Sequence, residues 1–154
     1  YDNNNTPIDE MWEKFPSWEQ FKIRAALAKC SLTTVHIESQ MKVLSGGEQA
    51  KVRLCKILNE KTNILMLDEP TNHLDIKYKI EILQIIKDLN INVLAVLHDI
   101  QLACKYSDYI YLMKGGEIKY EGNPKSTITK ESMKDVYDID CKISWADDNQ
   151  ALIE

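Results

Sequence analysis

The sequence has no long apolar run and no closely spaced cysteines, and these two absences narrow the function classes first. No hydrophobic stretch approaches the roughly 18 residues of a membrane-spanning helix, and no signal-peptide pattern opens the sequence. Cys30, Cys55, Cys104 and Cys141 lie far apart without C-x-x-C spacing, which argues against a zinc site or a disulfide framework. We therefore expect buried, reduced thiols in a cytoplasmic protein.

Basic residues are also fewer than acidic residues in this sequence. The formal net charge of −5 argues against nucleic-acid binding through the whole surface and leaves room only for a local basic patch. The sequence contains no internal repeat and no low-complexity block. Its 154 residues, 44% of them hydrophobic, suit one compact globular domain with a buried core.

The strongest signals lie in residues 44–75, LSGGEQAKVRLCKILNEKTNILMLDEPTNHLD. Ser45 is followed three residues later by Glu48, which is the spacing of a helix-capping box. Gly46 and Gly47 between them let backbone amides face outward without Cβ crowding. A helix start with free amides and a positive dipole end binds anions, most often phosphate.

The helix predicted to follow runs from about Gly46 to Asn59. We expect its apolar residues to pack inward and its basic residues to form a solvated face, with a role near phosphate or RNA as the minority interpretation. The inward set is Val52, Leu54, Cys55 and Leu58, and the basic set is Lys51, Arg53 and Lys56.

A second phosphate-related pattern follows at residues 64–69. Four apolar residues, 64–67, predict a strand that is buried on both faces, as in a parallel sheet. Asp68 and Glu69 follow where that strand ends, before Pro70. One carboxylate of such a pair can hold Mg²⁺, and its neighbour can orient or deprotonate an attacking water.

The rest of the chain predicts alternating helices and strands. Asp75 is placed to cap a helix over 76–89, and a buried strand over 92–97 presents His98 and Asp99 at its end. Asp99 is placed to cap the next helix, and Lys114-Gly115-Gly116 predicts a hairpin between 109–113 and 117–121. The other expected segments are helices 7–15, 18–30 (capped by Ser17 and Gln20) and 129–137, a polar connection 31–43 with a surface His36, a strand 141–145 and an acidic tail 146–154.

These motifs resemble those of ABC-type ATPases. LSGGE resembles the signature motif, ILMLDE the Walker B strand and NHLD the D-loop, in the family's order. The resemblance implies an α/β fold: a partial P-loop NTPase with a mostly parallel core sheet and a C-terminal β-hairpin. It further implies that residues 1–62 are part of the helical subdomain and residues 63–154 the C-terminal part of the RecA-like core.

The resemblance also implies ATP and Mg²⁺ as ligands. The signature would contact the γ-phosphate of ATP held by a second nucleotide-binding domain, Asp68 would serve Mg²⁺, and Glu69 would act as general base. His98, one strand after Walker B, matches the switch histidine that contacts the γ-phosphate, and Asp75 would couple across the dimer. The implied nucleotide-binding residues are Ser45, Gly46, Gly47, Glu48 and Asp75.

The motif G-x-x-x-x-G-K-[ST], which cradles the β- and γ-phosphates, does not occur in the sequence. We therefore expect the C-terminal part of an ABC nucleotide-binding domain, which alone binds ATP poorly and does not turn it over. A second nucleotide-binding domain and an integral membrane permease subunit are the partners that the resemblance implies, so the protein would lie on the inner face of the membrane.

The resemblance divides near residue 75. Residues 4–75 resemble ABC-F proteins, which act on ribosomes, whereas residues 75–143 resemble importer ATPases for iron–siderophores and cobalamin. We favour the importer interpretation because the C-terminal segment contains the switch region. The alternatives are an ABC-F ATPase, a non-catalytic module that donates its signature in trans, a truncated product without function, and a recombined chain.

Overall fold

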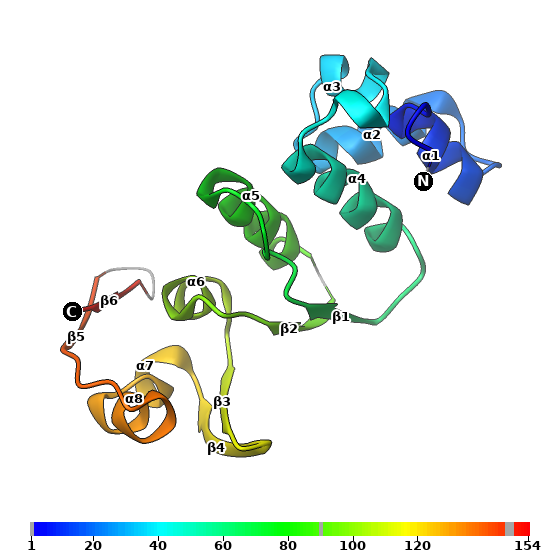
Figure 1. Cartoon of the computed structure of the whole chain (residues 1–154). Helices are drawn as coiled ribbons and strands as arrows, with labels where there is room; N and C mark the ends of the chain where they lie inside the picture. The colour runs from blue at the N-terminus through cyan, green and yellow to red at the C-terminus, as the bar shows by residue number, and fades with distance from the viewer. Residues whose placement is uncertain (1, 90, 147–149) are drawn as a thin grey trace. The chain divides into compact units, whose positions relative to one another are not determined.

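The computed structural model describes residues 2–89, 91–146 and 150–154. Its contacts divide the chain into two compact units, residues 1–95 and residues 96–154 (Figure 1). The subdomain division at residue 62 stays a prediction. Along the described part of the chain, no helix combines the length and apolar character that a membrane span requires.

The first unit begins with a cluster of helices, coloured blue to cyan in Figure 1. Most helix starts are fixed by side-chain caps: Thr6, Thr33 and Ser45 each form a capping box at the helix that follows them. The elements are α1 (Pro7–Lys14), α2 (Gln20–Lys29), α3 (Thr34–Glu38), the short 3₁₀ helix η1 (Met41–Val43) and α4 (Gly46–Leu58).

The cap predicted for α2 is wrong. Its N-cap is Glu19, and no side-chain hydrogen bond caps the helix. The chain makes a tight turn first, because the Trp18 ring stacks on Phe15 at 4.5 Å and the Trp18 carbonyl accepts a hydrogen bond from Trp12 Nε1 at 2.8 Å. This turn delays the helix by two residues beyond the predicted start.

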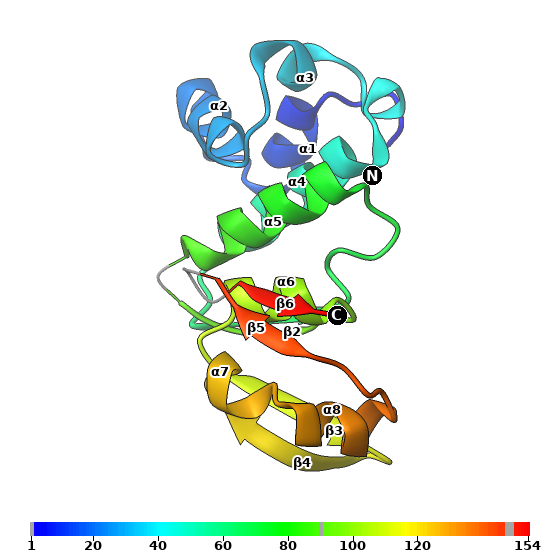
Figure 2. The same cartoon turned by 90° about the vertical axis from the view of Figure 1, so that its left-hand side faces the viewer.

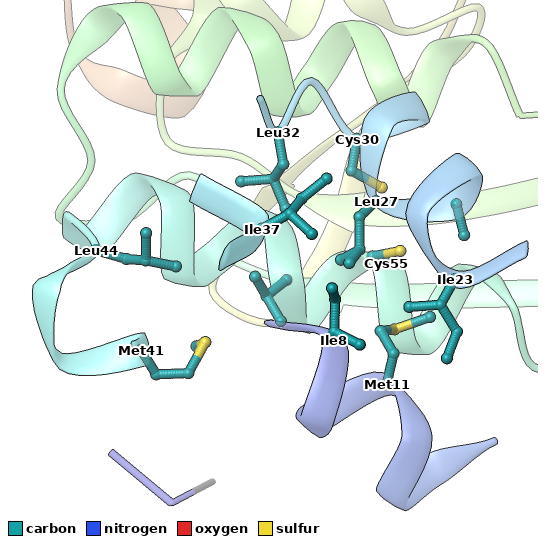
Figure 3. Packing of buried hydrophobic residues seen from close by; sticks show 12 residues of the cluster. Ile8, Met11, Ile23, Leu27, Cys30, Leu32, Ile37, Met41, Leu44 and Cys55 are labelled. Atoms are coloured by element: carbon teal, nitrogen blue, oxygen red, sulfur yellow. The ribbon is translucent and has the colours of Figure 1, made fainter. Parts of the chain in front are cut away.

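The core of the first unit lies between α1, α2, α3 and α4 (Figure 3). Its members are apolar and almost fully buried, and α4 contributes the inward face that the sequence predicts. Cys30 and Cys55 lie within this core, and all four cysteines of the chain are buried and free, as predicted. The labelled residues in Figure 3 include Ile8, Met11, Ile23, Leu27, Ile37 and Met41.

A strand–helix–strand segment ends the first unit: β1 (Ile64–Asp68), α5 (Ile76–Lys87) and β2 (Asn92–Val96), of which only Val96 belongs to the second unit. β1 pairs with β2 in a two-stranded sheet. The prediction that β1 is buried on both faces is wrong. Leu65 is 5% exposed, but Ile64 and Met66 on the other face are 62% and 73% exposed. Both faces of a strand are buried only when other elements cover both faces of its sheet, and here only one face is covered.

In the second unit, residues 96–146 and 150–154 form two antiparallel strand pairs and three helices. The predicted hairpin is confirmed: β3 (Ile110–Lys114) pairs with β4 (Glu117–Gly122), and Gly115 and Gly116 turn between them at φ 61° and 82°. The helices α7 and α8 pack on this hairpin (Figure 2). The helices are α6 (Ile100–Tyr106), α7 (Pro124–Thr127) and α8 (Lys130–Tyr137).

Part of the predicted acidic tail is a strand. β6 (Ala151–Ile153) pairs antiparallel with β5 (Ile143–Trp145), and Ala151 is buried in the core of the second unit. The apolar residues at 151–153 become buried when they pair with β5. The prediction of an acidic tail rested on the neighbouring acidic residues and therefore missed this strand. Residues 147–149 of the predicted tail, and Asn90, lie outside the described residues.

The basic face predicted on α4 is also largely wrong. Lys56 Nζ lies 2.7 Å from the carboxylate of Glu10, a side chain that is 0% exposed. Asn5 Nδ2 donates to the same carboxylate at 3.1 Å. Burial raises the pKa of Glu10, but the hydrogen bonds from Lys56 and Asn5 outweigh it, so the pKa lies below 4.5.

We predict that Glu10→Gln lowers the free energy of unfolding near neutral pH by about 1.5–3 kcal/mol, since it removes a charged, buried hydrogen-bond acceptor. A lowered pKa in the folded state means that Glu10 stabilises the fold fully above about pH 4.5 and loses this effect as pH falls through the folded value. Urea unfolding at several pH values measures this effect. Between neutral pH and about pH 3, the free energy of unfolding should fall less in the variant than in the wild type.

The control is Glu13→Gln, an exposed carboxylate on the same helix that also accepts from Asn5. Equal unfolding curves for the two variants would contradict the role assigned to Glu10.

Candidate functional site

The predicted capping box at the start of α4 is confirmed. The Glu48 amide donates to Ser45 Oγ at 3.3 Å, and the Ser45 amide donates to Glu48 Oε2 at 2.8 Å. The reciprocal bonds fix the first turn of a 13-residue helix. The arrangement presents a hydroxyl, two glycines and the positive end of a helix dipole, which suits an anion.

The two glycines of this turn differ in their surroundings. Gly46 is exposed, and a Cβ placed there would meet nothing within 4 Å. Gly47 is buried, and a Cβ there would lie 2.2–2.4 Å from ring atoms of Tyr78. Only Gly46 therefore has the uncrowded surroundings expected for both, whereas Gly47 is needed because α5 approaches α4 closely at this point (Figures 1 and 2).

A chain of hydrogen bonds joins the helix start to α5. Ser45 Oγ donates to the Tyr78 hydroxyl at 3.0 Å, and this hydroxyl donates to Glu48 Oε1 at 3.3 Å. His36 Nε2 lies 3.2 Å from the same carboxylate oxygen, so His36 is linked to the signature turn. Burial raises the pKa of Glu48, but Ser45, His36 and Tyr78 together lower it overall.

Lys51, predicted on a solvated face, is buried. Its side chain is 4% exposed and forms an ion pair with Glu81 of α5. Its ammonium also lies 5.3 Å from the centre of the Tyr78 ring and 3.4 Å from the Ser31 carbonyl oxygen, to which it donates. A buried charge must be paired, so Lys51 makes α4 and α5 mutually dependent.

The two acids predicted at the end of β1 lie where expected. Asp68 is exposed as the last strand residue, and Glu69 begins the following turn with a left-handed backbone of φ 47°. Asn72 Nδ2 donates to Glu69 Oε2 at 2.5 Å, and the Asn72 amide donates to the Glu69 carbonyl at 3.0 Å. A non-glycine residue in this region is strained, and such strain concentrates at functional sites.

An exposed aspartate at a strand end fits the oxygen chemistry of Mg²⁺. In the part of the chain that the structure describes, no group of three or more His, Cys, Asp or Glu side chains is placed to hold a metal ion.

The remaining predicted residues begin helices or precede them. Asp75 is the N-cap of α5 by position, although its side chain caps nothing. His98 is exposed just after β2, and Asp99 caps α6 through the Leu102 amide at 3.0 Å, as predicted. Seven of the predicted site residues lie in the first unit, Ser45, Gly46, Gly47, Glu48, Asp68, Glu69 and Asp75, and His98 lies in the second.

Comparison with known proteins supports the motif assignment. Residues 2–72 match the family model of the ABC transporter. The chain is 59% identical over 97 residues to the uncharacterised ABC transporter ATP-binding protein YfmM of Bacillus subtilis, covering 63% of this chain and 19% of that protein. It is 30% identical over 142 residues to the petrobactin import ATP-binding protein FpuD of Bacillus anthracis, covering 90% of this chain and 52% of that protein.

Solved structures show the same fold. A putative metal-chelate type ABC transporter in an inward-facing conformation superposes with a TM-score of 0.75 at 14% identity, over 98% of this chain and 67% of that one. The dimeric ATP-binding cassette MJ0796, bound to ADP and Pi, superposes with a TM-score of 0.64 at 24% identity, over 80% of this chain and 58% of that one.

The fold is therefore that of an ABC-type ATPase, a P-loop NTPase. Residues 2–72, which match the family model, include the LSGGE and ILMLDE sequences that resemble the signature and Walker B motifs. It spans about half the length of the importer relatives that it matches.

The residue that sequence reasoning missed is Tyr78. Its only sequence signal is a position three residues after Asp75, in the first turn of a predicted helix. Contact with Ser45, 33 positions earlier, arises only when α5 packs on α4.

We predict that Gly47→Ala destabilises the first unit by about 1–3 kcal/mol, because its Cβ overlaps the proximal part of the Tyr78 ring. Gly46→Ala is the matched control and should change the unfolding free energy by no more than about 0.5 kcal/mol, since its Cβ meets open space. Chemical denaturation of both variants measures the difference. Similar stabilities would show that Tyr78 does not press on Gly47.

Proposed function

We propose that this chain supplies the signature and Walker B elements of the ATP-binding subunit of an importer-type ABC system, of the iron–siderophore or metal-chelate class. The observation that carries the proposal is the pairing, within one folded unit, of a capped helix start at Ser45 with an acid pair at Asp68 and Glu69. The importer class is supported by relatives named for petrobactin import and ferric enterobactin transport.

In the proposed mechanism the start of α4 closes on ATP held by a second nucleotide-binding domain. The Ser45 hydroxyl and the amides at Gly46 and Gly47 donate to the γ-phosphate, favoured by the helix dipole. The dimeric cassette to which the chain is similar supports a facing domain of this kind.

The acid pair serves hydrolysis in the complete domain. Mg²⁺ bound at Asp68 would neutralise charge on the phosphates. Glu69 accepts a proton from the attacking water, and Asn72 holds one of its carboxylate oxygens at 2.5 Å. His98 donates to the γ-phosphate, and Asp75 couples the two domains at the start of α5.

We predict that Glu69→Gln, in a protein where this chain is joined to a phosphate-binding loop, lowers steady-state ATP hydrolysis by roughly 10²–10⁴-fold, the worth of general-base assistance. ATP binding should persist, because the amide keeps the size of the carboxylate. Phosphate release measures ATP hydrolysis, and retention of labelled ATP measures ATP binding. Glu121→Gln, an exposed acid on β4, should leave both unchanged; normal turnover in Glu69→Gln would exclude Glu69 as the base.

The chain alone should not turn ATP over, because it lacks the G-x-x-x-x-G-K-[ST] motif. Turnover assays of the isolated chain, and of the chain mixed with a domain that carries the motif, separate the roles. Stimulation only in the mixture supports donation of the signature in trans, whereas turnover by the isolated chain contradicts it.

A second candidate is an ABC-F ATPase acting on ribosomes. It rests on the resemblance of residues 4–75 to that class, and it stays a prediction. Co-purification distinguishes the two: an importer subunit should be recovered with an integral membrane protein, and an ABC-F protein with ribosomes.

A further inference from the structure

Tyr78 of α5 lies directly on the turn that is proposed to bind phosphate. Its ring covers Gly47, where a Cβ would be only 2.2–2.4 Å from the ring carbons. Its hydroxyl lies 3.0 Å from Ser45 Oγ and 3.3 Å from Glu48 Oε1. The mechanism above gives this side chain no role.

The direction of these hydrogen bonds follows from counting protons. The Glu48 carboxylate accepts from the Ser45 amide and lies beside His36, and an ionised carboxylate can only accept. The Tyr78 hydroxyl therefore gives its single proton to Glu48. Its oxygen is left as the acceptor for the single hydroxyl proton of Ser45.

A phosphate oxygen is also only an acceptor. Ser45 can donate its proton to Tyr78 or to a phosphate, but not to both. Burial of Gly47 beneath the same ring restricts the approach of a phosphate from that side. Exposed Gly46 is the part of the turn that stays open.

We propose that Tyr78 is a gate on the signature turn: it holds the Ser45 proton and covers Gly47 until the terminal phosphate of a nucleoside triphosphate displaces it. The inference rests on the proposed function, in which Ser45 receives phosphate from a facing domain. Tyr78 is a positioning residue, since it acts through Ser45 and Gly47 and not on the phosphate itself.

The gate connects two parts of the proposed site. Tyr78 lies in the first turn of α5, three residues after Asp75. The ion pair between Lys51 and Glu81 joins α5 to α4 about one turn further along α5. Phosphate binding at Ser45 therefore acts on the start of α5, where Asp75 is proposed to couple the two domains.

The test is a titration of the ¹⁵N-labelled full chain with inorganic pyrophosphate, in which the amide resonances of Gly46 and Gly47 are followed. Tyr78→Phe keeps the ring and removes the competing hydroxyl, so it should bind pyrophosphate about 3–10-fold more tightly than the wild type, the worth of one hydrogen bond. Tyr137→Phe on α8, a tyrosine of the second unit, is the matched control and should not change the affinity.

A double-mutant cycle shows whether the effect passes through Ser45. In the Ser45→Ala background, Tyr78→Phe should no longer tighten binding, because no serine proton remains to be released. A merely structural role for Tyr78 predicts the opposite sign, with weaker binding in Tyr78→Phe as the turn loosens.

Equal or weaker binding by Tyr78→Phe, with wild-type shifts at Gly46 and Gly47 intact, overturns the gate and leaves the proposed function standing. Tighter binding that persists unchanged with Ser45→Ala overturns the proton competition that defines the gate. Absence of any response at Gly46 and Gly47 in all variants overturns both the phosphate role of the turn and the gate.

Discussion

The packing of α5 on α4 depends on one position that has no side chain. At Gly47 the Tyr78 ring occupies the space that a Cβ would fill. Around this contact lie the buried ion pair of Lys51 with Glu81 and the hydrogen bonds that join Ser45, Tyr78 and Glu48. A glycine that the sequence predicts in a phosphate-binding turn is thus a packing requirement. The chemistry of the turn and the stability of the unit cannot be varied independently there.

The same packing places the two proposed phosphate elements in one folded unit. α4 begins at the capped turn and leads toward β1, β1 ends at Asp68, and the turn that follows Glu69 leads to α5. The left-handed backbone at Glu69 and His73 bends the chain sharply between the strand and the helix. The contact of Ser45 with Tyr78 therefore joins the start of α4 to the first turn of α5, three residues after Asp75.

Local signals in the sequence predicted most of the fold. Capping boxes, glycine turns and apolar periodicity act within a few residues, so the start of α4, the Asp99 cap and the β3–β4 hairpin were confirmed. Features that depend on distant partners were missed or misassigned. Lys51 and Lys56 of α4 proved to be paired because Glu81 and Glu10 come from other helices, and Tyr78 became a site residue only through tertiary packing. One face of β1 is likewise exposed because no other element covers it. The sequence of the strand itself does not determine which elements cover the sheet.

The start of α4 is proposed to bind nucleotide that is held by another domain. The most direct measurement is the association of this chain with a nucleotide-binding domain that carries a phosphate-binding loop, followed by sedimentation velocity with and without ATP and Mg²⁺. We predict an association that requires ATP and is weakened by Ser45→Ala. Association of equal strength without nucleotide, or unchanged by Ser45→Ala, would contradict it.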